Sequence, residues 1–178
     1  TQEKFERELY ITRKAIRSAL QDIEQLIITS MSSRTIVYKG MLIPHQIKHF
    51  FPDLLDPSME SAIALVHTRF PTNTFPRWDL VQPFRNLAHN GEINSLRGNI
   101  NWMIGRRPTL ESKLYENIKE IQPIIIPRGS DSACMDNVFE FLIQSGYSIP
   151  HAMMMMVPEA WEKSVNMSAE KKAFYEFH

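Results

Sequence analysis

Cysteine is scarce in this sequence, because Cys134 is the only one among 178 residues. A lone cysteine cannot form an internal disulfide, which excludes a secreted domain stabilised by several such bridges. The reducing interior of a cell, either the cytosol or an organelle, is therefore the environment that we expect.

Long apolar runs and an excess of either charge are also missing. No stretch approaches the roughly 20 apolar residues of a membrane span, and the charged start at residues 1–4 is unlike a signal peptide. Lysine plus arginine and aspartate plus glutamate both total 20, so the net charge provides no attraction to nucleic acid or anionic lipid. We expect a soluble protein whose partners include neither nucleic acid nor membrane.

The sequence does contain enough hydrophobic residues, 43% of the total, for one compact domain or a large part of one. An amphipathic helix is predicted over residues 4–25, where near-helical spacing should turn one apolar face inward, namely Phe5, Leu9, Ile16, Leu20 and Ile23. Further helices are predicted over 94–104, 150–161 and 168–177, and from a cap at Ser130 or Asp131 to Gly146.

Short β-branched or apolar runs predict strands at 26–29, 35–38, 62–67 and 121–126. The run 62–67 hardly alternates, which is typical of a strand covered on both faces. Prolines within 70–84 predict an irregular loop. Strands and helices in rough alternation indicate a layered α and β protein, and the pattern leaves the strand order open.

The dipeptide Asn90-Gly91 has two interpretations. Between short apolar stretches, such a pair commonly forms the two-residue turn of a tight hairpin. Alternatively, the glycine N–H and the asparagine amide can point together at a negatively charged oxygen that develops during a reaction.

Two charged residues are candidates for ligand binding. Arg69 follows the run 62–67 and opens the proline-rich loop, where a guanidinium can hold a carboxylate through two hydrogen bonds or form an ordinary surface ion pair. Asp131 lies beside Gly129 and Ser130 at a helix start, so it can cap that helix, bind an ammonium group, or do both.

Two other patterns favour structural roles. His45 and His49 lie about one helical turn apart, as a zinc pair would, but Gln46 replaces the glutamate of the zinc-protease pattern and no third ligand is near. Cys134 falls on the apolar face of its helix, where packing is a better interpretation than service as a thiolate.

Several longer motifs surround these candidates: Tyr38–Leu42, His67–Trp78, Gln82–Arg85, Ala88–Asn94, Leu96–Met103, Arg128–Ala133 and Pro158–Trp161. Together they closely resemble the glutamine amidotransferase domain of the glutamate synthase family, and they cover most of the chain. The segments 75–78 and 99–102 resemble this family rather than amidotransferases that make glucosamine phosphate or phosphoribosylamine.

The resemblance implies an α+β fold of the N-terminal-nucleophile hydrolase type, a four-layer αββα sandwich with mostly antiparallel sheets. It also implies hydrolysis of L-glutamine to glutamate and ammonia. At the matching positions, Arg69 would hold the α-carboxylate of glutamine and Asp131 its α-amino group. Asn90 and Gly91 would form the oxyanion hole.

The family nucleophile is an N-terminal cysteine whose own α-amino group can act as the base. Cys134 matches no such position, and Thr1 precedes a helical pattern instead of the apolar strand that a buried catalytic terminus would need. We therefore expect residues 1–178 to be an internal part of one glutaminase domain that lacks its nucleophile segment, and the segment alone to be inactive.

In the parent enzyme, the resemblance implies a synthase region with flavin mononucleotide (FMN) and an iron–sulfur cluster, where the ammonia aminates 2-oxoglutarate. It also implies an electron donor and a location in the cytoplasm or the plastid stroma. Neither a cysteine cluster nor a phosphate-cradling glycine loop is present here, so we assign both cofactors to the remainder of the parent and no metal to this segment. The alternative is a noncatalytic amino-acid-binding module of the same fold.

Overall fold

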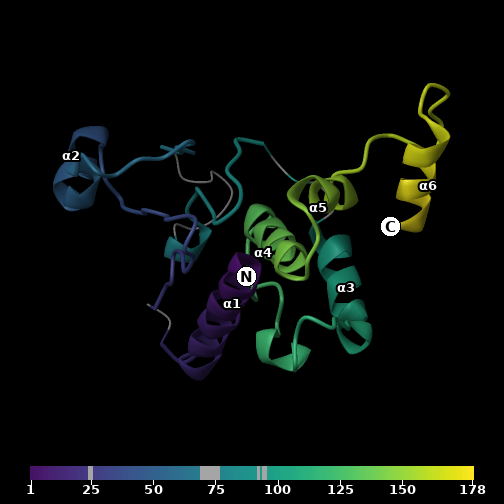
Figure 1. Cartoon of the computed structure of the whole chain (residues 1–178), viewed down its shortest axis with the longest axis horizontal. Helices are drawn as coiled ribbons and strands as arrows, with labels where there is room; N and C mark the ends of the chain where they lie inside the picture. The colour runs from purple at the N-terminus through teal and green to yellow at the C-terminus, as the bar shows by residue number, and fades with distance from the viewer. Residues whose placement is uncertain (24–25, 69–76, 92, 94–95) are drawn as a thin grey trace.

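The computed structural model describes residues 1–23, 26–68, 77–91, 93 and 96–178. The α-helices of this part are α1 (Gln2–Ala19), α2 (Pro44–Phe50), α3 (Leu96–Arg106), α4 (Asp131–Gln144), α5 (Ile149–Met156) and α6 (Ala169–Phe177). Short 3₁₀ helices are η1 (Pro52–Leu55), η2 (Trp78–Leu80), η3 (Arg107–Thr109) and η4 (Ile118–Ile121). Helix α4 lies near the centre beside α1 and α5, whereas α2 and α6 lie at opposite ends of the long axis (Figure 1).

Helix α1 confirms the amphipathic helix but not the face that the sequence predicted to be buried. Its buried residues are Glu6, Tyr10 and Arg13, whereas Phe5 is 52% exposed. Arg13 forms an ion pair with Glu140 of α4, and the Glu6 carboxylate accepts hydrogen bonds from the loop at residues 32–33. Polar partners on neighbouring elements therefore decide which side of this helix faces inward, and a hydrophobicity pattern does not record them.

Helix α4 confirms its prediction, including both ends. The Ser130 side chain accepts a hydrogen bond from the Ala133 N–H, which satisfies a donor that a helix start otherwise leaves without a partner. Gly146 follows the last turn with φ +97°, a left-handed conformation that side chains other than glycine's rarely tolerate. Of the two predicted caps, Ser130 is the N-cap and Asp131 begins the helix.

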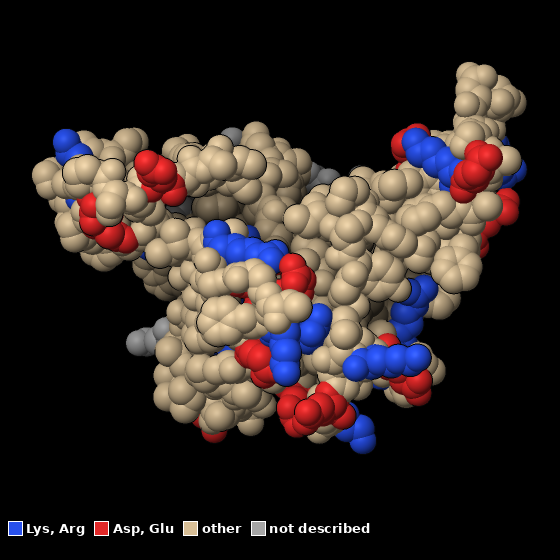
Figure 2. Space-filling model, viewed as in Figure 1, with Lys and Arg blue, Asp and Glu red and all other residues tan. Residues whose placement is uncertain are grey.

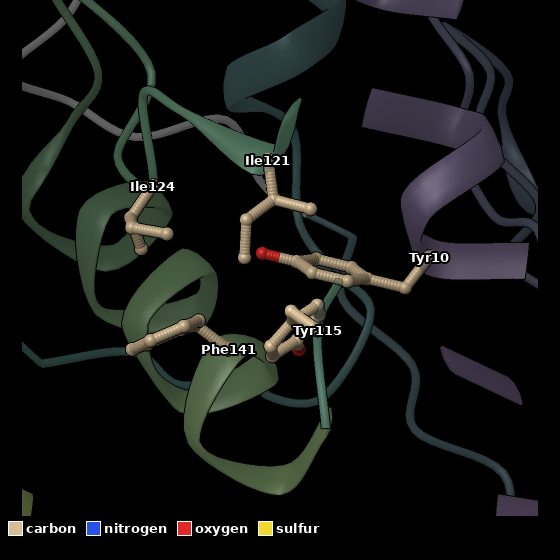
Figure 3. Close-up of a cluster of buried hydrophobic side chains, with 5 residues drawn as sticks. All are labelled: Tyr10, Tyr115, Ile121, Ile124 and Phe141. Atoms are coloured by element: carbon tan, nitrogen blue, oxygen red, sulfur yellow. The ribbon is translucent and has the colours of Figure 1, made fainter. Parts of the chain in front are cut away.

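The main hydrophobic core joins α1 and α4 to the segment that precedes α4. Its buried side chains, drawn in Figure 3, are Tyr10, Tyr115, Ile121, Ile124 and Phe141. The Tyr10 ring reaches from α1 toward Ile121 and Tyr115, while Phe141 faces them from α4. This core fixes the central helix that carries part of the candidate site.

Replacing Ile121 with alanine should lower the local free energy of unfolding by about 2 to 5 kcal/mol, because the buried side chain leaves a cavity. Ile121 is 0% exposed, whereas Val165 is 92% exposed, so Val165→Ala provides the control, with an expected loss below about 0.5 kcal/mol. Native-state hydrogen exchange of the α4 amides in the parent protein measures both losses. Equal protection in the two variants would contradict this description of the core.

None of the predicted strands forms a strand among the described residues. In the runs 26–29 and 35–38, side chains take the place of a backbone ladder. The Val37 N–H donates to the Ser30 hydroxyl at 3.0 Å, and the Val37 carbonyl accepts from the Thr29 hydroxyl at 3.1 Å. Apolar alternation shows that a segment can pair, but a strand also needs a partner backbone.

The run 62–67 is likewise not the covered strand that its composition predicted. Ile63, Leu65 and Val66 are 76%, 56% and 76% exposed. The run 121–126 begins at the end of η4 and contributes Ile121 and Ile124 to the core without forming a strand. The apolar residues of these two runs are therefore either packed into the core without a backbone ladder, as in 121–126, or exposed, as in 62–67.

The remaining helices agree with the predictions in kind, with changed ends. Helices α3, α5 and α6 fall within or close to the predicted ranges 94–104, 150–161 and 168–177. Ser148 and Ser168 cap α5 and α6 by accepting backbone hydrogen bonds. Among the described helices, none combines the length and the apolar character needed to cross a membrane. Charges of both signs are interspersed on the face shown in Figure 2.

Candidate active site

The segment that carries Asn90 and Gly91 is held in place by buried polar side chains. The Gln82 Oε1 atom accepts a hydrogen bond from the His89 N–H at 2.7 Å. Asp136 of α4, which is 0% exposed, accepts from the Asn86 N–H at 2.8 Å. The first contact ties His89 back to Gln82 at the start of the segment, and the second attaches Asn86 to α4.

Asp136 belongs to a buried charged cluster that also contains Arg85, Glu140 and Arg13. The Arg85 Nη1 atom lies 4.0 Å from carboxylate oxygens of both Asp136 and Glu140. Burial raises the pKa of Asp136, and the neighbouring Glu140 adds to the rise, while the Asn86 N–H and Arg85 act in the opposite direction. Two acids and two guanidiniums thus share one buried region, where each charge depends on its partners.

Asp131 presents a partly buried carboxylate at the start of α4. Its Oδ2 atom accepts from the Ile93 N–H at 2.9 Å, and its Oδ1 atom accepts from the N–H and hydroxyl of Ser132 at 2.6 and 3.1 Å. Burial acts to raise the pKa of Asp131, but the hydrogen bonds from Ile93 and Ser132 outweigh it and lower that pKa. The group is therefore a carboxylate at neutral pH, suited to hold a cation.

Two residues that the sequence interpretation did not single out connect Asp131 with Gly91. The Gly91 N–H donates to the Nδ1 atom of His89 at 3.1 Å, and the Nε2 atom of the same ring lies 2.6 Å from the Ser132 hydroxyl. Ser132 in turn contacts Asp131. The sequence could have indicated these two residues only through their positions next to assigned residues. His89 precedes Asn90-Gly91, and Ser132 follows Asp131 in the motifs.

The structure thus links Gly91 and Asp131, two of the residues assigned by resemblance. Asn90 and Gly91 lie in an exposed bend, and the described residues beside them form no hairpin ladder, because side chains take their backbone N–H groups. Arg69 lies outside the described residues.

Cys134 is a packed side chain, as the helical pattern predicted. It is 6% exposed, and burial raises the pKa of its thiol to about 11, with a further rise from the nearby charge of Asp131. A thiol with that pKa is almost fully protonated at neutral pH and is a poor nucleophile. His45 and His49 lie on α2, and no group of three or more potential metal ligands occurs within the described residues.

The comparison with known families identifies the family of this chain. The whole chain, residues 1–178, matches the family described as glutamine amidotransferases class-II. The chain belongs to the class-II glutamine amidotransferase family. This membership agrees with the resemblance that the motifs carried.

Three relatives show how widely the similarity extends among glutamate synthases. The chain is 48% identical over 176 residues to the NADPH glutamate synthase large chain of Bacillus subtilis and 49% identical over 175 residues to the NADH glutamate synthase of Schizosaccharomyces pombe. It is 44% identical over 178 residues to a chloroplastic ferredoxin-dependent glutamate synthase of Oryza sativa. These matches cover 98%, 97% and 98% of the chain.

The chain spans only 12%, 8% and 11% of the length of these three relatives. The similarity therefore establishes the family of this segment, and most of each relative lies outside the compared region.

Proposed function

We propose that this segment forms the glutamine-binding part of a glutaminase site, within a protein that hydrolyses L-glutamine to glutamate and ammonia. The observation that carries the proposal is the hydrogen-bonded chain from Gly91 through His89 and Ser132 to Asp131. It connects a candidate oxyanion donor to a carboxylate that is ionised at neutral pH, in a member of an amidotransferase family.

Each end of glutamine has a partner in this proposal. Asp131 binds the α-ammonium, and Arg69 binds the α-carboxylate through its two-pronged guanidinium. The Asn90 amide and the Gly91 N–H stabilise the oxyanion that forms when the side-chain amide is attacked. Because the Gly91 N–H donates to His89 in this structure, that bond is exchanged for one to the oxyanion during the reaction.

The nucleophile in this proposal is a cysteine of the parent protein outside residues 1–178, since burial makes Cys134 unsuitable. Its sulfur attacks the amide carbon, and the thiol proton passes through a base to the departing ammonia. Water then adds to the thioester, which releases glutamate and restores the thiol. The residues of this segment bind glutamine and stabilise the charge in both steps.

We further propose that the parent is a glutamate synthase in which the ammonia aminates 2-oxoglutarate in a synthase region. We assign FMN and an iron–sulfur cluster to that region. One buried cysteine cannot supply the several thiolates that a cluster requires. The names of the three relatives specify NADPH, NADH and ferredoxin, and we propose that the donor is one of these classes. Cytoplasm and plastid stroma are the proposed locations.

We also propose that residues 1–178 are part of one αββα glutaminase domain whose sheets are completed by strands from the rest of the parent. The exposed apolar side chains of Ile63, Leu65 and Val66 support this, because a neighbouring strand and helix layer would cover them. The hydroxyl groups of Thr29 and Ser30, which pair with the Val37 backbone in this structure, would be replaced by backbone partners when a neighbouring strand is added.

Glutaminase kinetics of the full-length parent test the function through Arg69. Arg69→Ala is expected to raise the KM for glutamine about 10- to 100-fold with little change in kcat, since a charge-assisted hydrogen bond contributes about 1.5 to 3 kcal/mol. Arg77→Ala is the control, because Arg77 forms an exposed ion pair with Asp79. Equal KM values for both variants and the wild type would show that Arg69 does not bind glutamine.

A further inference from the structure

The carboxylate of Asp131 is oriented by more hydrogen bonds than a simple helix start provides. Among the described residues, the donors are the Ile93 N–H, the Ser132 N–H and the Ser132 hydroxyl. A carboxylate has about four acceptor positions, and the three donors leave about one, on Oδ2. Fixing the carboxylate in this way aims that position in one direction.

The chain of hydrogen bonds from Gly91 to Asp131 begins at a backbone donor and ends at a carboxylate acceptor, and these two ends fix the direction of every bond between them. A backbone N–H can only donate, so the Nδ1 atom of His89 accepts from Gly91 and carries no proton. The proton of the neutral ring then lies on Nε2, which donates to the Ser132 oxygen at 2.6 Å. The Ser132 hydroxyl is left to donate to the Asp131 Oδ1 atom, 3.1 Å away.

Burial explains why the His89 contact matters for Ser132. The Ser132 residue is only 5% exposed, so water has little access to its hydroxyl. A freely rotating hydroxyl can point its proton at several acceptors. With His89 donating to its oxygen, the Ser132 proton has the Asp131 carboxylate as its remaining partner.

We propose that Ser132 and His89 are positioning residues that orient the Asp131 carboxylate toward the α-ammonium of glutamine. This inference rests on the proposed function and adds a determinant of substrate specificity to it. Ser132 acts on the binding of the amino group through Asp131, so its loss is expected to weaken recognition of the ammonium and to spare the chemical step. His89 also accepts from the Gly91 N–H, so the KM of its variants, and not their kcat, reports the positioning role.

The first test uses Ser132→Ala in the full-length parent. The KM for glutamine is expected to rise about 3- to 10-fold with kcat unchanged, as the loss of one hydrogen bond to a carboxylate implies. The inhibition constant of glutaramate, which is glutamine without its α-amino group, should stay at the wild-type value. A general structural defect would weaken both ligands, and that result would overturn the proposal.

Two His89 variants separate the ring nitrogens. His89→Gln places an N–H donor near the Nε2 position and should keep the KM within about twofold of wild type, whereas the shorter His89→Asn cannot reach Ser132 and should have the KM of Ser132→Ala. In the double variant His89→Asn with Ser132→Ala, KM should rise no further, because both changes break one chain of contacts. Additive rises would contradict the proposal.

The outcome also separates this inference from the proposed function. If Asp131→Ala and Arg69→Ala raise KM while Ser132→Ala and His89→Asn behave as wild type, only the positioning role fails. If all four leave KM unchanged, the proposed site itself is wrong. Should Ser132→Ala fold poorly, Ser132→Thr keeps the hydroxyl and is expected to restore wild-type KM, and a raised value would count against the role.

Discussion

Asn90→Ala in the full-length parent is expected to lower kcat for glutamine hydrolysis about 10²- to 10³-fold, because removing one oxyanion donor costs about 2.7 to 4 kcal/mol. The KM for glutamine should change little, since the oxyanion exists only after attack. Asn90 lies in an exposed bend outside the hydrophobic core, so a lower kcat reflects a lost contact with the transition state and not a loss of stability. Steady-state kinetics at several glutamine concentrations separate the two constants.

Asn166→Ala is the matched control for this experiment. Asn166 is also an exposed asparagine, and it lies in the segment between α5 and α6. Its replacement should leave both constants at wild-type values. A kcat for Asn90→Ala within about threefold of the control would show that the amide has no role in the transition state.

Asp131→Ala is expected to raise the KM for glutamine by about two orders of magnitude. The change removes the carboxylate that binds the ammonium and leaves the Ile93 and Ser132 N–H donors without their partner. Truncating one partner of a hydrogen-bonded charge pair costs about 2 to 5 kcal/mol. Measuring KM for glutamine and the inhibition constant for glutaramate shows whether the loss concerns the amino group.

Asp131→Asn removes the charge and nearly preserves the size of the side chain. Its amide oxygen can accept only one of the two backbone hydrogen bonds from Ile93 and Ser132, so it keeps part of the local structure while losing the attraction for an ammonium. The pKa of Asp131 is lowered, so its contribution to stability is present above the unfolded pKa and is lost only as the pH falls through the folded value. The ratio of mutant to wild-type KM should therefore stay constant between about pH 6 and 8. A ratio that falls toward 1 as the pH is lowered from 8 to 6 would mean that Asp131 titrates in that range.

Helix α4 and its caps could be predicted from the sequence because the determinants are local. Ser130 at the start and Gly146 after the end act within one turn of their own positions. The buried face of α1 could not be predicted, because Arg13 is held by Glu140, which lies 127 residues away in the chain. The predicted strands are absent among the described residues for a related reason, because a strand needs a partner backbone that a local pattern does not reveal.

The candidate site shows the same division between local and distant information. Asp131, Asn90 and Gly91 were assigned because their motifs resemble a family, and the structure then linked Gly91 to Asp131. His89 and Ser132 are 43 residues apart, so no local pattern indicates that they touch. The anchoring of Asn86 by Asp136 spans 50 residues and was equally hidden from periodicity.

The most direct test of the glutaminase site is a crystal structure of the full-length parent with its product L-glutamate. We expect an ammonium nitrogen within about 3.2 Å of the Asp131 carboxylate. We also expect a side-chain carboxylate oxygen that accepts from the Asn90 amide and the Gly91 N–H. A product molecule in the glutaminase domain that contacts neither Asp131 nor the 90–91 bend would contradict the proposed site.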